Sequence, residues 1–139
     1  MKENRETLLL DVSVSLRHMI RKVQAEINEL FSEYMPWNEF VILRALMHSS
    51  PKTASQIASE VDVTSSHVTA VSDRLVDKEY ISRTRSDLDR RIVNLEITEQ
   101  GRIVANKLEV LRKQYYKEKF TPWNDEEIKL VVELLHRIL

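Results

Sequence analysis

The sequence predicts a mainly α-helical domain that carries a small antiparallel β-ribbon. Its 139 residues include one Gly and three Pro, a composition that favours helices over turn-rich β folds. Apolar residues recur every three or four positions through most of the chain, which is the period of an amphipathic helix. Only two short runs, at 80–85 and 92–97, alternate apolar and polar side chains as strands do.

The composition indicates one globular domain of ordinary size. The chain is long enough for a single compact core, and its 42% hydrophobic and 31% charged residues are typical of a folded protein. Cys is absent, which excludes disulfides and thiolate metal sites. No apolar run has the length of a membrane span, and no signal peptide is recognisable. We therefore expect one cytoplasmic domain over residues 1–139.

The first predicted helix covers residues 9–34 and carries a heptad-like apolar stripe. Leu9, Leu16, Val23 and Leu30 repeat every seven residues, which aligns them along one side of a helix. Because so long a helix cannot bury its whole stripe inside so small a domain, its first turns are expected to contact a second chain.

A second helix is predicted after Pro36, which punctuates the chain. Its apolar positions share a related face and are expected to be core residues that tie the long helix to residues 53–77. They are Trp37, Phe40, Leu43, Leu46 and Met47.

The pattern over residues 53–77 predicts two short helices joined by a tight turn. Thr53 and Gln56 form the Thr-x-x-Gln capping box that marks a helix start. The apolar pattern breaks at 61–63, and the hydroxyls of residues 64–66 can cap a second helix. In that helix Val68, Val71 and Leu75 share a buried face, while the opposite face begins with small polar residues. This arrangement is typical of a helix-turn-helix.

The two strand-like runs come after the second helix of this motif. In the later run Val93, Leu95 and Ile97 share one face. The loop between the runs is charged, and from Arg83 to Arg91 the chain has four Arg against two Asp. A β-ribbon that follows a recognition helix is a wing, so the segment is predicted to be a winged helix-turn-helix.

Two further helices are predicted after the wing. Thr98 is a suitable N-cap for the first, which continues to about Phe120. Pro122 ends it, and Asn124 with Glu127 resembles another capping box. The apolar positions of these helices are Val104, Leu108, Leu111 and Tyr115 in the first, and Ile128, Val131, Leu135 and Ile138 in the second.

Several motifs between residues 66 and 101 resemble those of the MarR family of bacterial transcriptional regulators. The Asp-x-Arg of the wing, at its distance from a following Thr-Glu-x-Gly, is the most specific. The resemblance covers nearly all of the chain, and implies a DNA-binding lobe at about 36–98 between dimerisation helices at about 5–34 and 99–139. The matching motifs are Ser66-x-Val68-Thr69, Asp73-Arg74-Leu75, Ile81-x-Arg83, Asp89-Arg90-Arg91 and Ile97-Thr98-Glu99-x-Gly101.

The resemblance implies a homodimeric, sequence-specific regulator, usually a repressor, that binds double-stranded DNA. Two-fold symmetry predicts an inverted-repeat operator. The net charge of −1 predicts that affinity comes from two copies of the site rather than from one strongly basic face. Many members also bind a small-molecule effector. Candidates for lining such a pocket, each with an ordinary core or surface role as the alternative, are Arg17, His18, Arg21, Trp37 and Met47.

The recognition helix and the wing supply the candidate DNA-contacting residues. Hydroxyls, a Thr methyl and an imidazole can read base edges, and helix N-termini also hold phosphates. Arg suits the narrow minor groove, where Arg90 or Arg91 is expected to enter while Asp89 orients an Arg; the sequence leaves open which of the two enters. Arg74, Arg83 and Arg85 are candidates for phosphate contacts. The full set is Thr64, Ser65, Ser66, His67, Thr69, Arg74, Arg83, Arg85, Arg90 and Arg91.

Glu79 departs from the family pattern, in which Gly usually follows the recognition helix. Gly suits a helix end that needs a positive φ, and a left-handed Glu costs on the order of 1 kcal/mol. We therefore expect the turn at Glu79 to differ locally.

Two other classes of function remain as alternatives. A winged-helix dimer that binds another regulatory protein is motivated by the weak net charge. An enzyme has little support, because no nucleophile–base set and no Gly-rich phosphate loop is present. The four His show no metal spacing. The sequence therefore predicts no catalytic residue, no metal and no cofactor.

Overall fold

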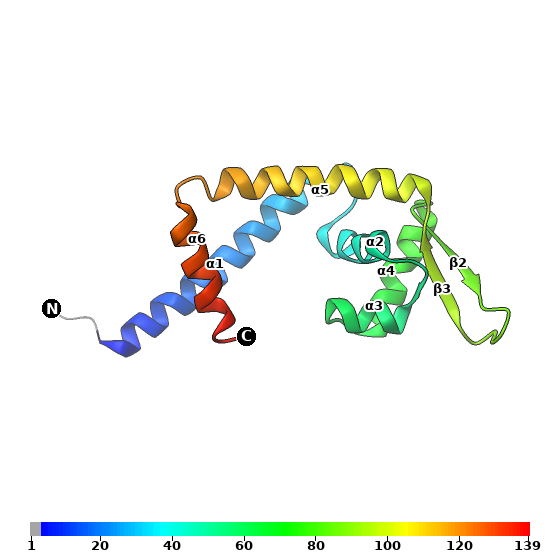
Figure 1. The fold of residues 1–139 in the computed structure, drawn as a ribbon, viewed down its shortest axis with the longest axis horizontal. Coiled ribbons are helices and arrows are strands. Elements are labelled where there is room, and N and C mark those ends of the chain that lie inside the picture. The colour runs from blue at the N-terminus through cyan, green and yellow to red at the C-terminus, as the bar shows by residue number, and fades with distance from the viewer. Residues whose placement is uncertain (1–3) are drawn as a thin grey trace.

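The computed structural model describes residues 4–139 as six helices and a small antiparallel sheet. Helix α5 runs along one edge of the molecule, with the sheet and α2, α3 and α4 near its start and α6 near its end (Figure 1). Helix α1 descends from the middle of α5, and α6 descends from the far end of α5 on the same side of the view; these two helices are called the arm. The elements are α1 (Arg5–Leu30), α2 (Trp37–His48), β1 (Lys52–Thr53), α3 (Ala54–Val61), α4 (Ser65–Asp77), β2 (Ile81–Arg85), β3 (Val93–Ile97), α5 (Glu99–Lys119) and α6 (Asp125–His136).

The helix starts agree with the capping pattern of the sequence. Both capping boxes form, at Thr53 with Gln56 and at Asn124 with Glu127. Thr98 caps α5 by accepting from the Gly101 amide at 3.0 Å. Helix α1 ends at Leu30 rather than at residue 34. Residues 31–34 form a turn instead, and the helix does not resume before Pro36, which disfavours helical geometry in Met35.

The sheet has three strands in the order β1–β3–β2, and all neighbours are antiparallel. The wing is β2 paired with β3, from Ile81 opposite Ile97 to Arg85 opposite Val93. Strand β1 was not predicted because it contains only two residues, too few for an alternating pattern. It pairs Lys52 with Leu95 and thereby fixes the root of the wing to the start of α3.

The core lies where α2, α4, the sheet and the first half of α5 meet. Phe40, Leu43 and Leu46 are buried as predicted, and the Phe31 ring meets Phe40 edge to face at 5.2 Å between centroids. Trp37 and Met47 are only half-buried at the margin of this core. The remaining buried apolar residues include Ile57, Val68, Val71, Leu75, Ile81, Leu95 and Leu108.

A polar contact ties α1 to the far half of α5. The Tyr115 hydroxyl donates to Glu26 Oε2 at 2.7 Å, and Lys119 Nζ lies 3.2 Å from Glu26 Oε1. Burial, together with the bond to Glu26, raises the pKa of Tyr115 to about 12. The same hydrogen bond, followed by that of Lys119, lowers the pKa of Glu26. Helix α1 is thus held near its C-terminal end.

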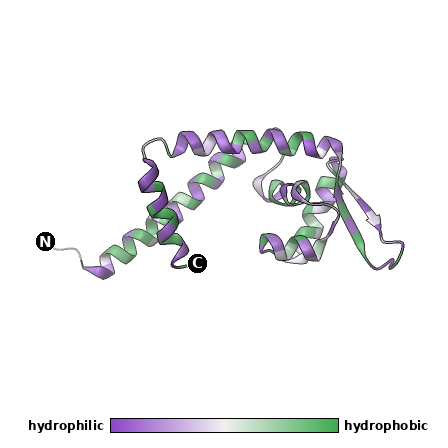
Figure 2. Cartoon of the chain, viewed as in Figure 1, coloured by the Kyte–Doolittle hydropathy of each residue, from purple (hydrophilic) through white to green (hydrophobic). Residues whose placement is uncertain are grey.

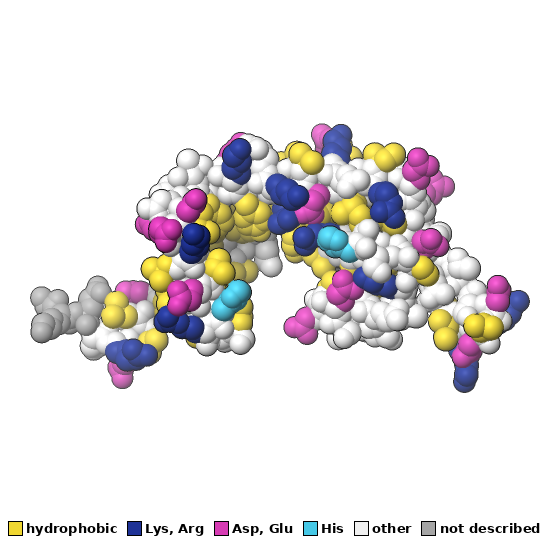
Figure 3. Space-filling view, in the orientation of Figure 1, with side chains coloured by type: hydrophobic (Ala, Val, Ile, Leu, Met, Phe, Trp, Pro, Cys, Tyr) yellow, Lys and Arg dark blue, Asp and Glu magenta, His cyan; other side chains and the backbone are white. Residues whose placement is uncertain are grey.

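The arm formed by α1 and α6 leaves its apolar residues largely uncovered. Ile27 is the buried residue of α1, and no residue of α6 is buried. Hydrophobic residues recur along both helices (Figure 2), and they appear on the arm surface in Figure 3. The exposed ones include Leu8, Leu9, Leu10, Ile20, Leu130 and Leu134. None of the helices within residues 4–139 is both long and apolar enough to cross a membrane.

The turn after α4 has the usual left-handed helix end, although a residue with a side chain is strained there. The change in turn geometry that was expected at Glu79 therefore does not occur. Glu79 has a φ of 66°, in the left-handed region. The Tyr80 amide donates to the Leu75 carbonyl at 3.0 Å, as in a Schellman helix end. Thr98 Oγ1 also donates to the Glu79 carbonyl at 2.8 Å. These bonds hold a geometry that Gly would adopt without strain.

Gly101, the one glycine of the chain, lies against the residue that follows this turn. A Cβ at this position would stand 2.0 Å from the Tyr80 carbonyl oxygen, and 3.1 Å from the Ile97 side chain. The same Tyr80 oxygen accepts from the Thr98 amide at 3.0 Å. Close approach of α5 to the root of the wing therefore requires a residue without a side chain.

Candidate nucleic-acid interface

The start of α4 presents small polar side chains on an exposed surface. Thr64 is the N-cap, and its side chain accepts from the His67 amide at 3.1 Å. Ser65, Ser66 and Thr69 are exposed, while Val68 on the opposite side is fully buried. Burial of one face thus directs the other face outward, as the sequence predicts.

These polar side chains are not equally available to a ligand. The Thr69 hydroxyl donates to the Ser65 carbonyl at 3.0 Å, so it presents its methyl group and lone pairs. His67 is half-buried and lines a depression of about 210 Å³ between α2, α3 and α4. Ser66 Oγ lies 3.2 Å from Thr64 Oγ1, and Thr64 serves first as a cap. Within residues 4–139 the Ser65 hydroxyl forms no such bond and is therefore the freest of the four for base contacts.

At the wing tip, Asp89 binds Arg91 through both of its carboxylate oxygens. Arg91 Nε lies 3.1 Å from Oδ1 and Nη2 lies 3.2 Å from Oδ2, while the Arg91 amide donates to Oδ1 at 3.0 Å. The side-chain bond to Arg91, followed by the backbone bond, lowers the pKa of Asp89. The Arg91 side chain remains 91% exposed. Asp89 thus fixes the direction of an arginine that is otherwise in solvent.

Two other arginines of the wing have partners within the protein. Arg83 forms an ion pair with Asp73, which joins β2 to α4, the recognition helix of the predicted motif. Arg85 donates to the Arg90 carbonyl at 2.7 Å across the base of the loop. The Arg90 side chain forms no ion pair in the part of the chain described here. The described geometry therefore separates Arg83 and Arg85, which brace the wing, from Arg90 and Arg91, which project from it.

Arg74 lies apart from this cluster and faces α2. Its Nε is 3.4 Å from Oε2 of Glu39, whose other oxygen lies 2.8 Å from Lys78 Nζ. Sequence reasoning missed Glu39, which lies in the apolar second helix and is only 3% exposed. No local signal could have found it, because Glu39 and Lys78 are 39 positions apart in the sequence.

Among the five candidate effector residues, only Trp37 lines the apolar cavity between α1, α2 and α5. This cavity has a volume of about 240 Å³, and its lining residues are Met19, Ile20, Val23, Gln24, Ile27, Trp37 and Tyr116. Arg17, His18 and Arg21 are exposed on α1, and Met47 packs near the end of α2. The structure thus does not gather these five residues around that cavity.

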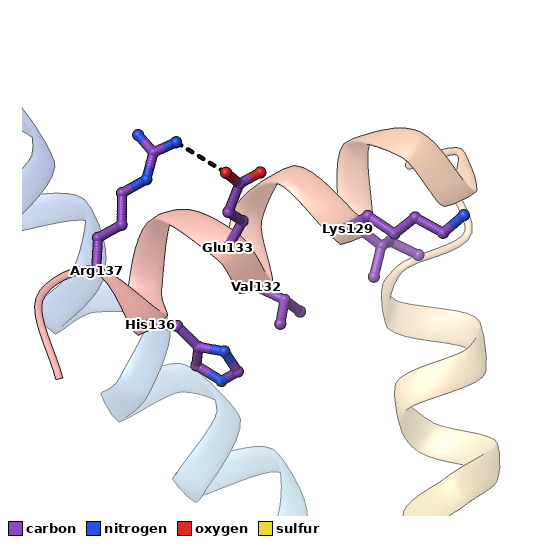
Figure 4. Close-up of a pocket in the computed structure, with 6 residues that line it drawn as sticks. Lys129, Val132, Glu133, His136 and Arg137 are labelled. Atoms are coloured by element: carbon purple, nitrogen blue, oxygen red, sulfur yellow. Dashed lines mark hydrogen bonds and ion pairs between the residues drawn. The ribbon is translucent and has the colours of Figure 1, made fainter.

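A second concave surface lies far from the recognition helix, on α6. Figure 4 shows Val132 and His136 beside an ion pair in which Arg137 Nη2 lies 2.8 Å from Glu133 Oε1. This depression measures about 600 Å³ and also includes Ile128 and Lys129. It lies on the arm and brings together none of the predicted site residues.

The fold and this interface define a winged helix-turn-helix protein. The MarR family model matches residues 35–93, and over 96% of its length the chain is 36% identical to the uncharacterized HTH-type transcriptional regulator YpoP of Bacillus subtilis, of which it covers 95%. The chain belongs to the MarR family, and is a DNA-binding transcriptional regulator.

Two further comparisons agree with this assignment. The HTH-type transcriptional repressor MdtR of Bacillus subtilis is 35% identical over 70% of this chain and 64% of its own length. The crystal structure of a mutant MarR from Escherichia coli complexed with operator DNA superimposes with a TM-score of 0.85 over 99% of both chains. At 19% identity, this second likeness concerns the fold alone.

Proposed function

We propose that this protein is a homodimeric repressor that binds an inverted-repeat operator. The proposal rests on one observation about the DNA-binding lobe. Its recognition helix, α4, is exposed, and beside it lies a wing that carries arginines and is held in place by side-chain contacts. The name of MdtR, a repressor, supports the sign of regulation. Catalysis forms no part of the proposal, because the family consists of transcriptional regulators.

A second copy of the chain is the proposed occupant of the apolar arm. The leucines on α1 and α6 are about half exposed, so covering the rest of each side chain would contribute roughly 1 kcal/mol, about half the value for a fully exposed leucine. Between α5 and α6 lies an apolar recess of about 660 Å³, whose lining includes Tyr116, Phe120, Trp123, Val131 and Leu135. The two apolar helices and this recess together supply the self-complementary surface that a two-fold interface needs.

Dimerisation would place two recognition helices on one face of the duplex. Half-sites would then be centred about one helical turn apart, ~10–10.5 bp. An operator selected from a random duplex library is expected to be an inverted repeat, and footprinting should protect both halves. Protection of one asymmetric half-site by one subunit would contradict the proposal.

Salt dependence separates DNA binding from binding to another protein. In fluorescence anisotropy with the selected duplex, affinity is expected to fall by a factor of about 10³ or more between roughly 50 and 200 mM salt, because binding releases counterions. Affinity for the duplex that stays weak and independent of salt would favour the alternative of a protein-interaction module.

Asp89→Ala is expected to weaken DNA binding although it removes a negative charge. In the structure Asp89 holds Arg91 by two side-chain bonds, so its loss frees an arginine that must then be ordered on binding. Affinity for the selected operator should move toward that of Arg91→Ala, which is expected to lower the salt slope by about one unit. Asp87→Ala removes an equal charge from the same loop and serves as the control. Tighter binding by Asp89→Ala than by the parent at matched salt would refute the orienting role.

Arg91→Ala and Ser66→Ala are expected to affect base preference differently. The minor groove distinguishes A·T from G·C but little else, whereas base edges in the major groove are distinct. Loss of Arg91 should therefore weaken binding to most sequences alike, and loss of the Ser66 hydroxyl should change which sequences are preferred. Selections from the same duplex library with each variant measure this difference.

We further propose that a small apolar effector occupies the cavity lined by Trp37 and Tyr116. The cavity lies between α1, which belongs to the arm, and α2, which belongs to the DNA-binding lobe. A ligand there would alter DNA affinity only if it bound one spacing of arm and lobe better than the other.

A further inference from the structure

One buried carboxylate of α2 holds two cations of the recognition helix. Glu39 is 3% exposed. Its Oε1 lies 2.8 Å from Lys78 Nζ and its Oε2 lies 3.4 Å from Arg74 Nε. A buried carboxylate is costly unless it is paired, and here the two cations and the N-terminal end of α2 compensate the charge. The ion pairs of Glu39 with Lys78 and Arg74 thus offset the cost of burying its charge.

The two cations stand one helical turn apart, so a single carboxylate fixes α4 at two points. Lys78 is the C-cap residue of α4, and its Nζ also donates to the Tyr34 carbonyl at 3.3 Å. These contacts hold the C-terminal half of α4 against α2 and the turn that follows α1. The N-terminal half, with its exposed hydroxyls, is left to project from the lobe.

The guanidinium of Arg74 is engaged on one side only. Its side chain is 50% exposed and lines a concave surface of about 510 Å³ with Gln24, Asn28, Trp37 and Asn38. Nε faces Glu39, and within residues 4–139 no other ion pair is formed by this side chain. Its two terminal nitrogens are thus free to donate to an anion while Nε remains beside the carboxylate.

We propose that Glu39 is a positioning residue for DNA binding: it orients Arg74 so that the terminal guanidinium nitrogens contact a backbone phosphate beside the major groove. The proposal rests on the proposed function in which α4 enters that groove. Glu39 acts by ordering the Arg74 side chain before DNA arrives, which removes part of the entropy cost of the contact. Its own charge is outnumbered by the two cations beside it.

The test measures affinity for the selected operator over a series of salt concentrations for Glu39→Gln, Arg74→Ala and the double variant. Each single variant is expected to bind about tenfold more weakly, with a salt slope reduced by about one unit, because each loses the same phosphate contact. The double variant is expected to be no weaker than Arg74→Ala. Glu60→Gln is the matched control: it neutralises an exposed acid that pairs with Lys52 in the same lobe, and it is expected to keep the parent slope.

Arg74→Lys provides a second variant that does not disturb a buried group. It keeps the charge, but an ammonium lacks the planar fork that can engage Glu39 and a phosphate together. It is expected to bind the operator more weakly than the parent but to keep most of the parent salt slope, because a lysine can still neutralise a phosphate. A role of Glu39 in folding alone would lower the melting temperature of Glu39→Gln and leave the slope unchanged for protein that is fully folded at the assay temperature.

Two results would overturn the proposal. One is an unchanged salt slope for Arg74→Ala, since Arg74 would then contact no phosphate. The other is Glu39→Gln binding as tightly as the parent with the parent slope. Both are measured against a parent that binds DNA in a salt-dependent manner. Absence of that parental binding would instead contradict the proposed function itself.

Discussion

Gly101→Ala is expected to destabilise the protein by about 2 kcal/mol or more, although it replaces a helical glycine. Ala gains about 1 kcal/mol over Gly from helix propensity. Its Cβ, however, would stand 2.0 Å from the Tyr80 carbonyl oxygen, a backbone atom that cannot rotate away. Overpacking costs typically 1–3 kcal/mol and occasionally more, and a contact of 2.0 Å with a backbone atom belongs at or above the upper end of that range, which leaves a net loss of about 2 kcal/mol or more. The steric cost is expected to exceed the gain, because the turn at Tyr80 is also fixed by the bond from Thr98.

Thermal unfolding followed by circular dichroism measures this effect. We expect the melting temperature of Gly101→Ala to fall by roughly 5–10 °C. Gln100→Ala, at the exposed neighbouring position of the same helix, is the control and should change it little. A melting temperature for Gly101→Ala equal to or above that of the parent would show that α5 does not need this close approach.

Charges placed on both apolar helices are expected to abolish the dimer and most of the DNA affinity. Leu9 on α1 is 52% exposed and Leu135 on α6 lines the apolar recess. Changing both to Glu would bury charges in the proposed interface, which is strongly unfavourable. A dimer gains affinity by joining two half-sites, a gain of 10²–10⁴ in typical linked binders, so the monomer should bind the operator at least ~100-fold more weakly.

Light scattering gives the mass of the variant, and anisotropy gives its affinity. Ser15→Glu with Asn106→Glu adds the same two charges at exposed polar positions of α1 and α5, and this control should remain a dimer. Insoluble protein from the double leucine variant would also be consistent with lost burial. A soluble Leu9→Glu, Leu135→Glu protein with unchanged dimer mass would place the interface elsewhere.

The sequence predicted the elements whose signals are local. The capping boxes at Thr53 and Asn124 fixed two helix starts within a few residues, because a cap involves only near neighbours. The alternation of Val93, Leu95 and Ile97 predicted the wing strand for the same reason. The resemblance to a family of known fold then supplied the order in space, which periodicity alone does not determine.

The features that the sequence did not predict depend on contacts between distant residues. Strand β1 contains two residues and exists because β3 is beside it. Glu39 meets Lys78 across 39 positions of sequence, so no short-range pattern marks the pair. For Glu79 the reverse holds: a local rule predicted a changed turn, but the long-range bond from Thr98 keeps the left-handed geometry.

The position of β2 in the sheet has a consequence for self-association. Because the strand order is β1–β3–β2, one edge of β2 has no neighbouring strand in the described sheet. Such an edge can pair with a strand of another molecule, and this pairing is a first step toward aggregation. The charge of Arg83 is offset by its ion pair with Asp73, so Arg85 is the residue that places positive charge along this strand and disfavours the approach of two wings edge to edge. The arginine that braces the wing loop thus also protects the open edge of β2 from pairing with another molecule.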